Sequence, residues 1–448
     1  MKSGKGLGLE ETFDRLVNQL LNGLKEDEHL KLGLKGEQSQ FVRFNKAKVR
    51  QTGCVEDGQL SMTLMQNQRN GFRNFPITGD WDVDQRQAEL ALAELRQEIP
   101  QLPEDPYLVL PQGTATSREN HAGKLLKPES VASSLLSEMA GVDFTGLYAG
   151  GSLVRAYADS VGQKHWFSTE FFSVDYSLFT EDGQAVKGTF AGNEWNDAAY
   201  SGRLTEAKNQ LERLAQPPKS IPRGQYRTYL APGAVAELLS MFSWGAVSEG
   251  SLQRGGSALA LLQRGEKQFS PQFHITENFK PGLVPRFNEW GDIAPIELSL
   301  IQSGKLVNTL ISSRTAKEYG KVANGATGSE SLRSPEILPG TLPAANILKA
   351  LDTGLYLSNL HYLNWSDRPT GRITGMTRYA CFWVENGEIV APIENMRFDE
   401  SLYQCLGNNL IALTDFQEFI PEVGTYHHRN SGGVRVPGIL SEGFTYTL

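Results

Sequence analysis

Cysteine and histidine are scarce in this chain of 448 residues. The three cysteines, Cys54, Cys381 and Cys405, are odd in number and far apart, so they predict reduced thiols in a cytoplasmic protein rather than a disulfide framework. Of the seven histidines, only His427 and His428 are close together. Because no H-E-x-x-H and no C-x-x-C occurs, the sequence excludes the common zinc motifs.

Long apolar runs are missing too. No stretch of eighteen apolar residues occurs, so we expect no transmembrane helix, and the first residues lack the apolar segment of a signal peptide. The net charge of −8, from 43 basic and 51 acidic side chains, gives no reason to expect nucleic acid or an anionic membrane as a partner. A P-loop, a G-x-S-x-G elbow and a convincing G-x-G-x-x-G are also absent.

The spacing of apolar residues predicts both helices and strands in this chain. Short alternating apolar runs favour adjacent antiparallel strands with one buried face, and Asp182-Gly183 favours a hairpin. The clearest helix has Phe13, Leu16 and Leu20 on one stripe. The expected helices lie at residues 9–25, 84–97, 130–141 and 197–214, and the alternating runs at 29–35, 41–44, 48–51 and 59–66.

A proline-rich segment predicts the main boundary of the chain. Pro217, Pro218 and Pro222 cannot continue a helix or a central strand, so we expect domains at 1–220 and 225–448, the first with a possible subdivision near 105–130. The second half contains the clearest hairpin, in which Asn386-Gly387 suits a type I′ turn, and ends in a predicted strand at 432–448.

The mid-chain segment LLSMFSWGAVSEGS, residues 238–251, predicts an apolar helix that carries nothing reactive. Cys381 lies in an aromatic-rich strand with no base nearby in sequence, and His165 is typical of a packed aromatic cluster. The pair His427-His428 could hold a metal if the backbone bent suitably. Because neighbouring side chains in a strand point to opposite faces, a solvated loop is the favoured interpretation.

Several segments together resemble the TldD/PmbA family, also called TldD/TldE or "modulator of DNA gyrase". They are FVRFNKAKVRQTG with NQRNGF in the first half, and TRYACFWVENGEIVAPIENMRF with VPGILSEGFTYTL in the second. The resemblance covers nearly the whole chain and is weakest at 100–130 and 270–345. It implies an α+β fold of two domains, an N-terminal α/β domain and a C-terminal antiparallel β-rich domain with a central helix.

The family has two branches, and this chain resembles the TldE branch. TldD-type subunits carry H-E-x-x-x-H on the central helix and a cysteine near the C-terminus, and they bind zinc. Aligned on Leu238-Leu239, those helix positions are Ser240, Met241 and Gly245, none of which can bind zinc or act as a base. The two histidines of that motif are five residues apart. In a regular helix, a spacing of five residues places the second side chain about 140° around the axis from the first, so the motif also needs a distorted helix to bring both to one ion. The cysteine position falls in TYHHRNSGG, where His427 or His428 is a remote substitute.

The resemblance implies a metal-free subunit with no catalytic residue and no cofactor of its own. Zinc is expected only in a TldD-type partner, with which the chain would form a hetero-oligomer, or it would form a homo-oligomer. Trp244, Ser248 and Ser251 are candidates for the wall of a cavity that holds an unfolded or extended peptide, although plain core is the alternative for this segment. Two other functions stay open: a self-sufficient peptidase or hydrolase with an unconventional site, and a non-enzymatic binding or regulatory protein.

Overall fold

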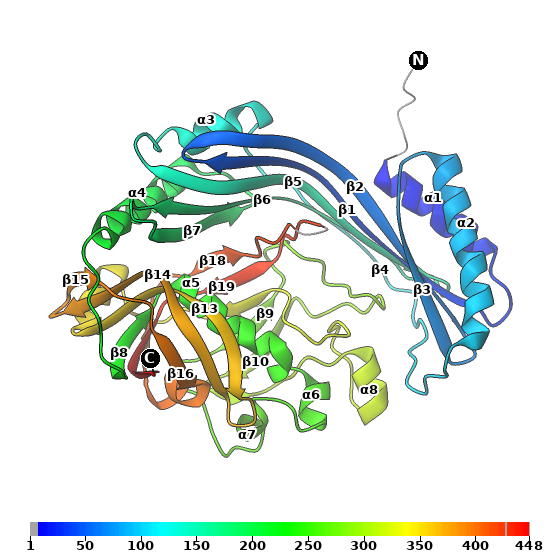
Figure 1. Ribbon diagram of the computed structural model, residues 1–448. Helices are drawn as coiled ribbons and strands as arrows, with labels where there is room; N and C mark the ends of the chain where they lie inside the picture. The colour runs from blue at the N-terminus through cyan, green and yellow to red at the C-terminus, as the bar shows by residue number, and fades with distance from the viewer. Residues whose placement is uncertain (1–7, 426–427, 448) are drawn as a thin grey trace.

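The computed structural model describes residues 8–425 and 428–447. It is an α+β structure in which a long curved sheet from the first half of the chain arches over two sheets from the second half (Figure 1). The strand order of the long sheet is β3-β2-β1-β5-β6-β4, with β7 paired to β6. Its strands are β1 (His29–Asn45), β2 (Lys48–Gln66), β3 (Arg69–Pro76), β4 (Thr116–His121), β5 (Asp143–Asp159), β6 (Lys164–Phe179) and β7 (Ala185–Gly192).

The four short alternating runs of the first half are two long strands, which corrects the predicted bounds. Strands β1 and β2 pair in antiparallel register from His29–Met65 to Asn45–Lys48, with one irregularity at Arg43 and Phe44. Backbone pairing therefore continues through the polar segment in which the apolar alternation is interrupted. The β6–β7 hairpin turns at Gly183, whose φ of +87° is a left-handed conformation.

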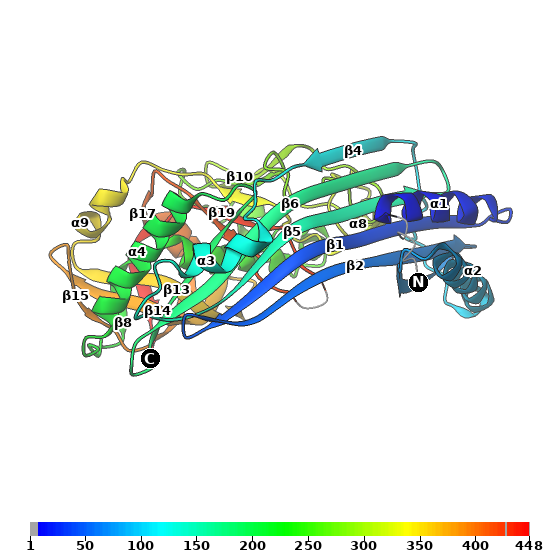
Figure 2. The same ribbon diagram turned by 90° about the horizontal axis from the view of Figure 1, so that it is seen from above.

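Helices cover both ends of the long sheet (Figure 2). Helix α2 begins three residues before the predicted start because the Asp80 carboxylate accepts hydrogen bonds from the amides of Asp82 and Val83. The helix predicted at 130–141 is much shorter in the structure. The helices of this half are α1 (Leu9–Asn22), α2 (Trp81–Glu98), α3 (Val131–Leu136) and α4 (Asp197–Leu214).

The second half forms two sheets, ordered β11-β10-β9-β12-β19-β18 and β13-β8-β20-β16-β14-β15, with β17 paired to β20. The strands are β8 (Gly224–Leu230), β9 (Ile275–Asn278), β10 (Glu297–Gln302), β11 (Lys305–Leu306), β12 (Pro335–Ile337), β13 (Gly354–Asp367), β14 (Arg372–Glu385), β15 (Glu388–Pro392), β16 (Arg397–Ser401), β17 (Leu410–Leu413), β18 (Glu418–Pro421), β19 (Gly433–Val436) and β20 (Ile439–Tyr446). The helices are α5 (Pro232–Met241), α6 (Glu249–Gln253), α7 (Ala260–Gln263), α8 (Ser313–Tyr319) and α9 (Ile347–Leu351).

The segment predicted as one final strand is two strands that belong to different sheets. Pro437 and Gly438 lie between them, and the Tyr229 ring packs so closely on Gly438 that a Cβ there would come within 2.1 Å of its hydroxyl. Proline cannot donate to a sheet ladder, and glycine leaves room for the ring, so the chain changes sheets at this point.

The largest buried cluster surrounds α5, and a second cluster joins the two halves, because Ala380 and Phe382 of β14 pack with Phe172 and Tyr176 of β6. The predicted division into domains at 220–225 stays a prediction. Across residues 8–425 and 428–447, no helix is both long enough and apolar enough to cross a lipid bilayer.

Candidate functional site

The mid-chain segment is two helices and not the single helix that its apolar run predicts. Helix α5 ends at Met241, and the next five residues form a wide turn in which Trp244 has φ −86° and ψ 52° and Gly245 has φ +81°. Helix α6 then starts after Ser248, whose side chain accepts a hydrogen bond from the amide of Ser251. A left-handed residue cannot continue a right-handed helix, so Gly245 breaks the run.

The three positions singled out by sequence offer no metal ligand. The Ser240 hydroxyl donates to the carbonyl of Glu237 at 2.7 Å, so it is bound within its own helix. Met241 is fully buried in the core cluster around α5. Gly245 has no side chain, and a Cβ there would lie 3.1 Å from the Ser251 hydroxyl in a strained backbone conformation. Zinc takes imidazole, thiolate or carboxylate ligands, so these residues do not fit the ion.

The three residues proposed as a cavity wall have different environments. Trp244 is 48% exposed, whereas Ser248 and Ser251 are buried. The Ser248 hydroxyl donates to Glu330 Oε2 at 2.5 Å and accepts from the Ser251 amide at 3.0 Å. The two serines therefore form the N-terminal cap of α6, and only Trp244 is placed to meet a ligand from solvent.

A buried carboxylate that no sequence pattern marks organises this region. Glu330 is 2% exposed and its side chain accepts from the amides of Gly250 and Ser312, at 2.9 and 2.8 Å. Ser312 caps α8, so one charge serves the N-termini of both α6 and α8, where the helix dipole stabilises an anion. Eighty residues separate Glu330 from Gly250 in the chain, and no local pattern links them.

The C-terminal loop carries the two histidines considered as remote metal ligands. His427 lies outside the described residues. In His428, Nδ1 lies 3.7 Å from Asp57 Oδ2 and Nε2 lies 3.3 Å from Gln59 Oε1, so both ring nitrogens face strand β2. Within residues 8–425 and 428–447, no three His, Cys, Asp or Glu side chains are grouped in a way that could hold a metal ion.

The next residue, Arg429, anchors this loop to the long sheet. Its side chain is 1% exposed, and its guanidinium donates to the carbonyls of Phe171 at 2.7 Å, Gly151 at 2.9 Å and Ala149 at 3.3 Å. The Glu37 carboxylate lies 3.9 Å from its Nε. Burial lowers the pKa of Arg429 to about 10. Sequence reasoning missed this residue because its partners come from three strands far away in the chain.

Cys381 and His165, which the sequence predicts to be packed rather than reactive, are buried in the structure. Burial raises the pKa of Cys381 to about 11, which keeps the thiol protonated and unreactive at neutral pH. Burial lowers the pKa of His165, whose ring lies 6.0 Å from that of Tyr157 and 5.3 Å from that of Phe287. His165 therefore belongs to an aromatic cluster.

The hairpin turn between β14 and β15 contains two left-handed residues. Asn386 has φ 52° and Gly387 has φ 79°, the signs that a type I′ turn requires. The Gly387 amide donates to the carbonyl of Asp352 at 2.7 Å, which ties the turn to the end of α9.

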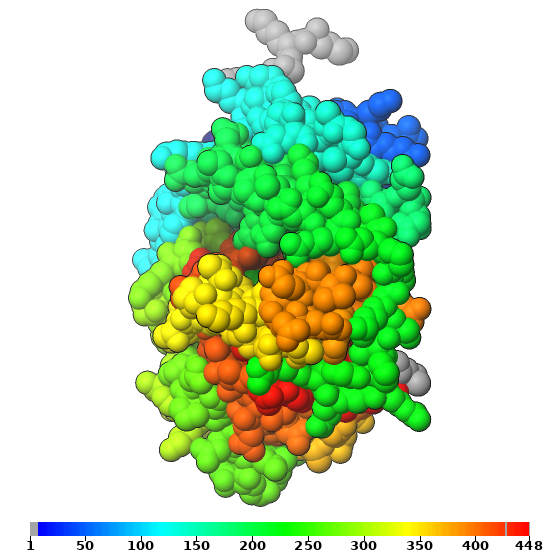
Figure 3. Space-filling model, turned by 90° about the vertical axis from the view of Figure 1, so that its left-hand side faces the viewer, coloured from blue at the N-terminus to red at the C-terminus, as the bar shows by residue number. Residues whose placement is uncertain are grey.

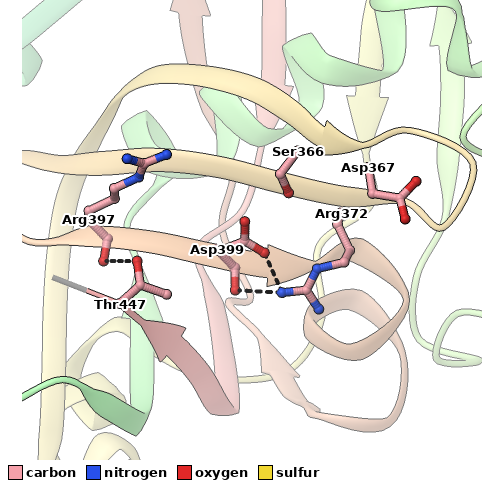
Figure 4. Close-up of a pocket in the computed structure, with 6 residues that line it drawn as sticks. All are labelled: Ser366, Asp367, Arg372, Arg397, Asp399 and Thr447. Carbon is pink, nitrogen blue, oxygen red and sulfur yellow. Dashed lines mark hydrogen bonds and ion pairs between the residues drawn. The ribbon is translucent and has the colours of Figure 1, made fainter.

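A shallow pocket near the C-terminus has a volume of about 580 Å³ (Figure 4). Arg372 forms an ion pair with Asp399, and the Arg397 carbonyl accepts from the Thr447 amide at 2.8 Å. The pocket holds two arginines and two aspartates, so its charges are balanced, and it contains no thiol or imidazole. Its lining residues are Ser366, Asp367, Arg372, Arg397, Asp399 and Thr447.

Residues 223–447 match a family profile described as the PmbA/TldA metallopeptidase C-terminal domain. The match covers half of the chain. The chain belongs to the PmbA/TldD family. Sequence comparison adds a "Metalloprotease PmbA homolog" from Haemophilus influenzae, 25% identical in an alignment of 281 residues that covers 59% of this chain and 58% of the relative. The alignment thus spans less than two thirds of that protein's own length.

Solved structures show the same fold along nearly the whole chain. TldE from Thermococcus kodakarensis gives a TM-score of 0.76 at 13% identity, covering 98% of this chain and 100% of its own. A proposed modulator of DNA gyrase from Bacteroides thetaiotaomicron gives a TM-score of 0.76 at 18% identity, covering 98% of each chain. Another proposed modulator of a DNA gyrase, from Thermotoga maritima, gives a TM-score of 0.73 at 16% identity, covering 98% of this chain and 100% of its own. At these identities the likeness establishes the fold.

Proposed function

We propose that this chain is a metal-free, TldE-like subunit of a two-subunit peptidase, and that a TldD-type partner supplies the zinc. The observation that carries the proposal is the chemistry at Ser240, Met241 and Gly245: a hydroxyl bound to its own helix, a thioether in the core and a residue without a side chain. A zinc hydrolase needs ligands for the ion and a base for its water, and these positions supply neither.

The contribution of this chain to proteolysis is then to hold the peptide. Strand β3 pairs with β2 along Gln59–Gln66, the Ile77 amide donates to the Gly58 carbonyl at 2.7 Å, and within the described ranges no other strand covers the outer edge of residues 48–57. A free strand edge offers main-chain donors and acceptors to an extended peptide, a mode of binding that tolerates many sequences. The exposed Trp244 is a second candidate contact.

We also propose that the pair works in the cytoplasm. Cys54, Cys381 and Cys405 are all free thiols, and free thiols are typical of proteins from a reducing compartment.

Reconstitution tests the proposal. The chain and an H-E-x-x-x-H relative from the same cell are purified separately, and cleavage of an unstructured peptide is followed by mass spectrometry. We expect no cleavage by this chain alone, and faster cleavage by the mixture than by the relative alone. Cleavage by this chain alone that survives a chelator and a second purification step would instead favour a self-sufficient hydrolase.

A further inference from the structure

A cavity of about 740 Å³ lies between the two halves of the chain. One wall comes from α4, β6 and β7, and the other from α5, β13, β14 and β18. Figure 3 shows the hollow between α4 (green), the segment around α9 (yellow) and β15 (orange), with red chain in its depth. Ser240, Met241 and Gly245 do not line it, whereas Glu237, one turn earlier on α5, does.

Two cations in the cavity are already neutralised by the protein. Arg203 Nη1 lies 2.6 Å from Glu418 Oε1, and Lys187 forms an ion pair with Asp175. A third cation, Arg213, is exposed on the last turn of α4. The interior therefore presents no unpaired cation to an anionic ligand.

Two carboxylates that line the cavity form no ion pair within 4.0 Å among the described residues, although both residues are exposed to solvent and the Arg203 charge acts on Glu206. Glu206 of α4 and Glu237 of α5 line it from opposite walls, and neither side chain accepts a hydrogen bond from the described part of the chain. Partial burial raises the pKa of both carboxyls, and for Glu206 the nearby Glu418 charge raises it further while the Arg203 charge lowers it. An incoming cation would favour the ionised form of Glu237, whose pKa no nearby charge lowers, and would add to the effect of Arg203 on Glu206.

Tyrosines give the cavity an aromatic lining with free hydroxyls. Tyr176 and Tyr229 are 3% and 1% exposed, and neither hydroxyl makes a hydrogen bond with the described residues. The Tyr176 ring lies over Gly188, where a Cβ would come within 2.4 Å of it, so glycine at 188 is what admits the ring. The rings of Tyr229 and Tyr356 lie 5.3 Å apart. Buried hydroxyls need partners, and aromatic faces attract cations.

We propose that this cavity binds an alkylammonium group, a primary amine on a slender aliphatic stem. Glu206 and Glu237 pair with the ammonium, the tyrosine hydroxyl oxygens accept hydrogen bonds from its remaining N–H groups, and the aromatic faces pack on the stem. The amine belongs either to a free linear diamine or to a lysine side chain of a peptide. The site goes beyond the proposed subunit function, because it needs neither zinc nor a partner.

Calorimetric titration of the purified full chain tests the site with two amine probes, 1,5-diaminopentane and a tripeptide with blocked ends and a central lysine. Glutarate, a dianion of the same length as the diamine, is the control ligand. The variants Glu206→Gln and Glu237→Gln each remove one charge, from α4 and from α5. If one substitution disturbs the fold of its helix, the other still tests whether the cavity binds an amine. Glu212→Gln, on the exposed surface of α4 outside the cavity, is the matched control.

We expect saturable binding of at least one amine, weakened tenfold or more by each cavity variant and unchanged by Glu212→Gln, with no binding of glutarate. Binding of the diamine alone identifies a small-molecule site, and binding of the tripeptide alone identifies a site for lysine side chains. If neither amine binds, or if both cavity variants bind as the unaltered chain does, the proposal is wrong.

Discussion

Arg429 shows how a single buried charge can fix the relative position of distant segments. Its guanidinium donates to backbone carbonyls of the long sheet, while the loop that carries it belongs to the second half of the chain. Removing the guanidinium takes a donor from these carbonyls and the cationic partner from the 4% exposed Glu37 carboxylate, which keeps only the backbone amide of residue 429, at 3.3 Å, as a donor from this loop.

Arg429→Met should therefore lower the free energy of unfolding by about 3–5 kcal/mol, the usual cost of breaking a buried ionic pair. Urea titration followed by tryptophan fluorescence measures the change. Arg43→Met, at an exposed position of β1, is the control and should have little effect. Equal, small losses in both variants would show that the loop does not depend on the Arg429 contacts.

Glu277 of β9 gives stability a pH dependence. It is 2% exposed, and burial raises its pKa to about 6, although Arg333 and two backbone amides act in the opposite direction. A carboxyl whose pKa is higher in the folded state binds protons more tightly there. Its contribution is full below the unfolded value of 4.5 and is lost as the pH rises through 6.

The predicted loss from this one group between pH 4.5 and pH 7 is about 2 kcal/mol, at 1.36 kcal/mol for each pKa unit. Urea titrations of the chain and of Glu277→Gln across that range should differ by this amount. Glu297→Gln, an exposed change on the neighbouring strand β10, should keep the pH profile of the unaltered chain. A profile for Glu277→Gln that matches the unaltered chain would contradict the assignment.

At the scale of elements, the break between α5 and α6 is the feature that decides the candidate site. Sequence periodicity predicts one apolar helix there, because the apolar residues of the turn and of both helices fill the same core. The turn itself depends on a left-handed Gly245 and on a cap formed by Ser248 and the distant Glu330. The glycine is visible in sequence, whereas the carboxylate becomes recognisable only in three dimensions.

Gly245→Ala should destabilise the chain by about 1–2 kcal/mol, because a Cβ is strained at φ +81° and would press on the Ser251 hydroxyl. Gly202→Ala is the matched control, since Gly202 lies within α4 and has open space around it. That control should gain up to about 1 kcal/mol from helix propensity. Thermal unfolding of the two variants compares them directly, and a gain in both would show that the break is not needed.

At the same scale, the sequence predicts the hairpins and helices better than the lengths of the strands. Residues 48–51 and 59–66 read as separate runs because polar residues interrupt the alternation between them, yet the backbone pairing with β1 continues through the interruption. Local patterns report which side chains are buried. They do not report how far a ladder extends along a partly exposed edge.

At the scale of the whole molecule, the family and the mixed α+β fold could be recognised from the order of several weak segments. The cavity between the halves could not, because Glu206, Glu237 and Tyr176 come from three elements whose proximity depends on how the sheets pack. The lack of zinc ligands at the mid-chain helix is a property of the residues themselves, so it could be read from sequence. Under the proposed function, its meaning depends on a zinc-bearing partner.

The most direct test of the central claim is a metal measurement on a complex captured from native cells. The chain carries an affinity tag, its partners are identified by mass spectrometry, and zinc is quantified in the complex and in the separated chains. We predict an H-E-x-x-x-H relative in the complex and zinc that stays with that relative. One zinc bound per molecule of this chain after separation, and lost on replacing His428, would contradict the account.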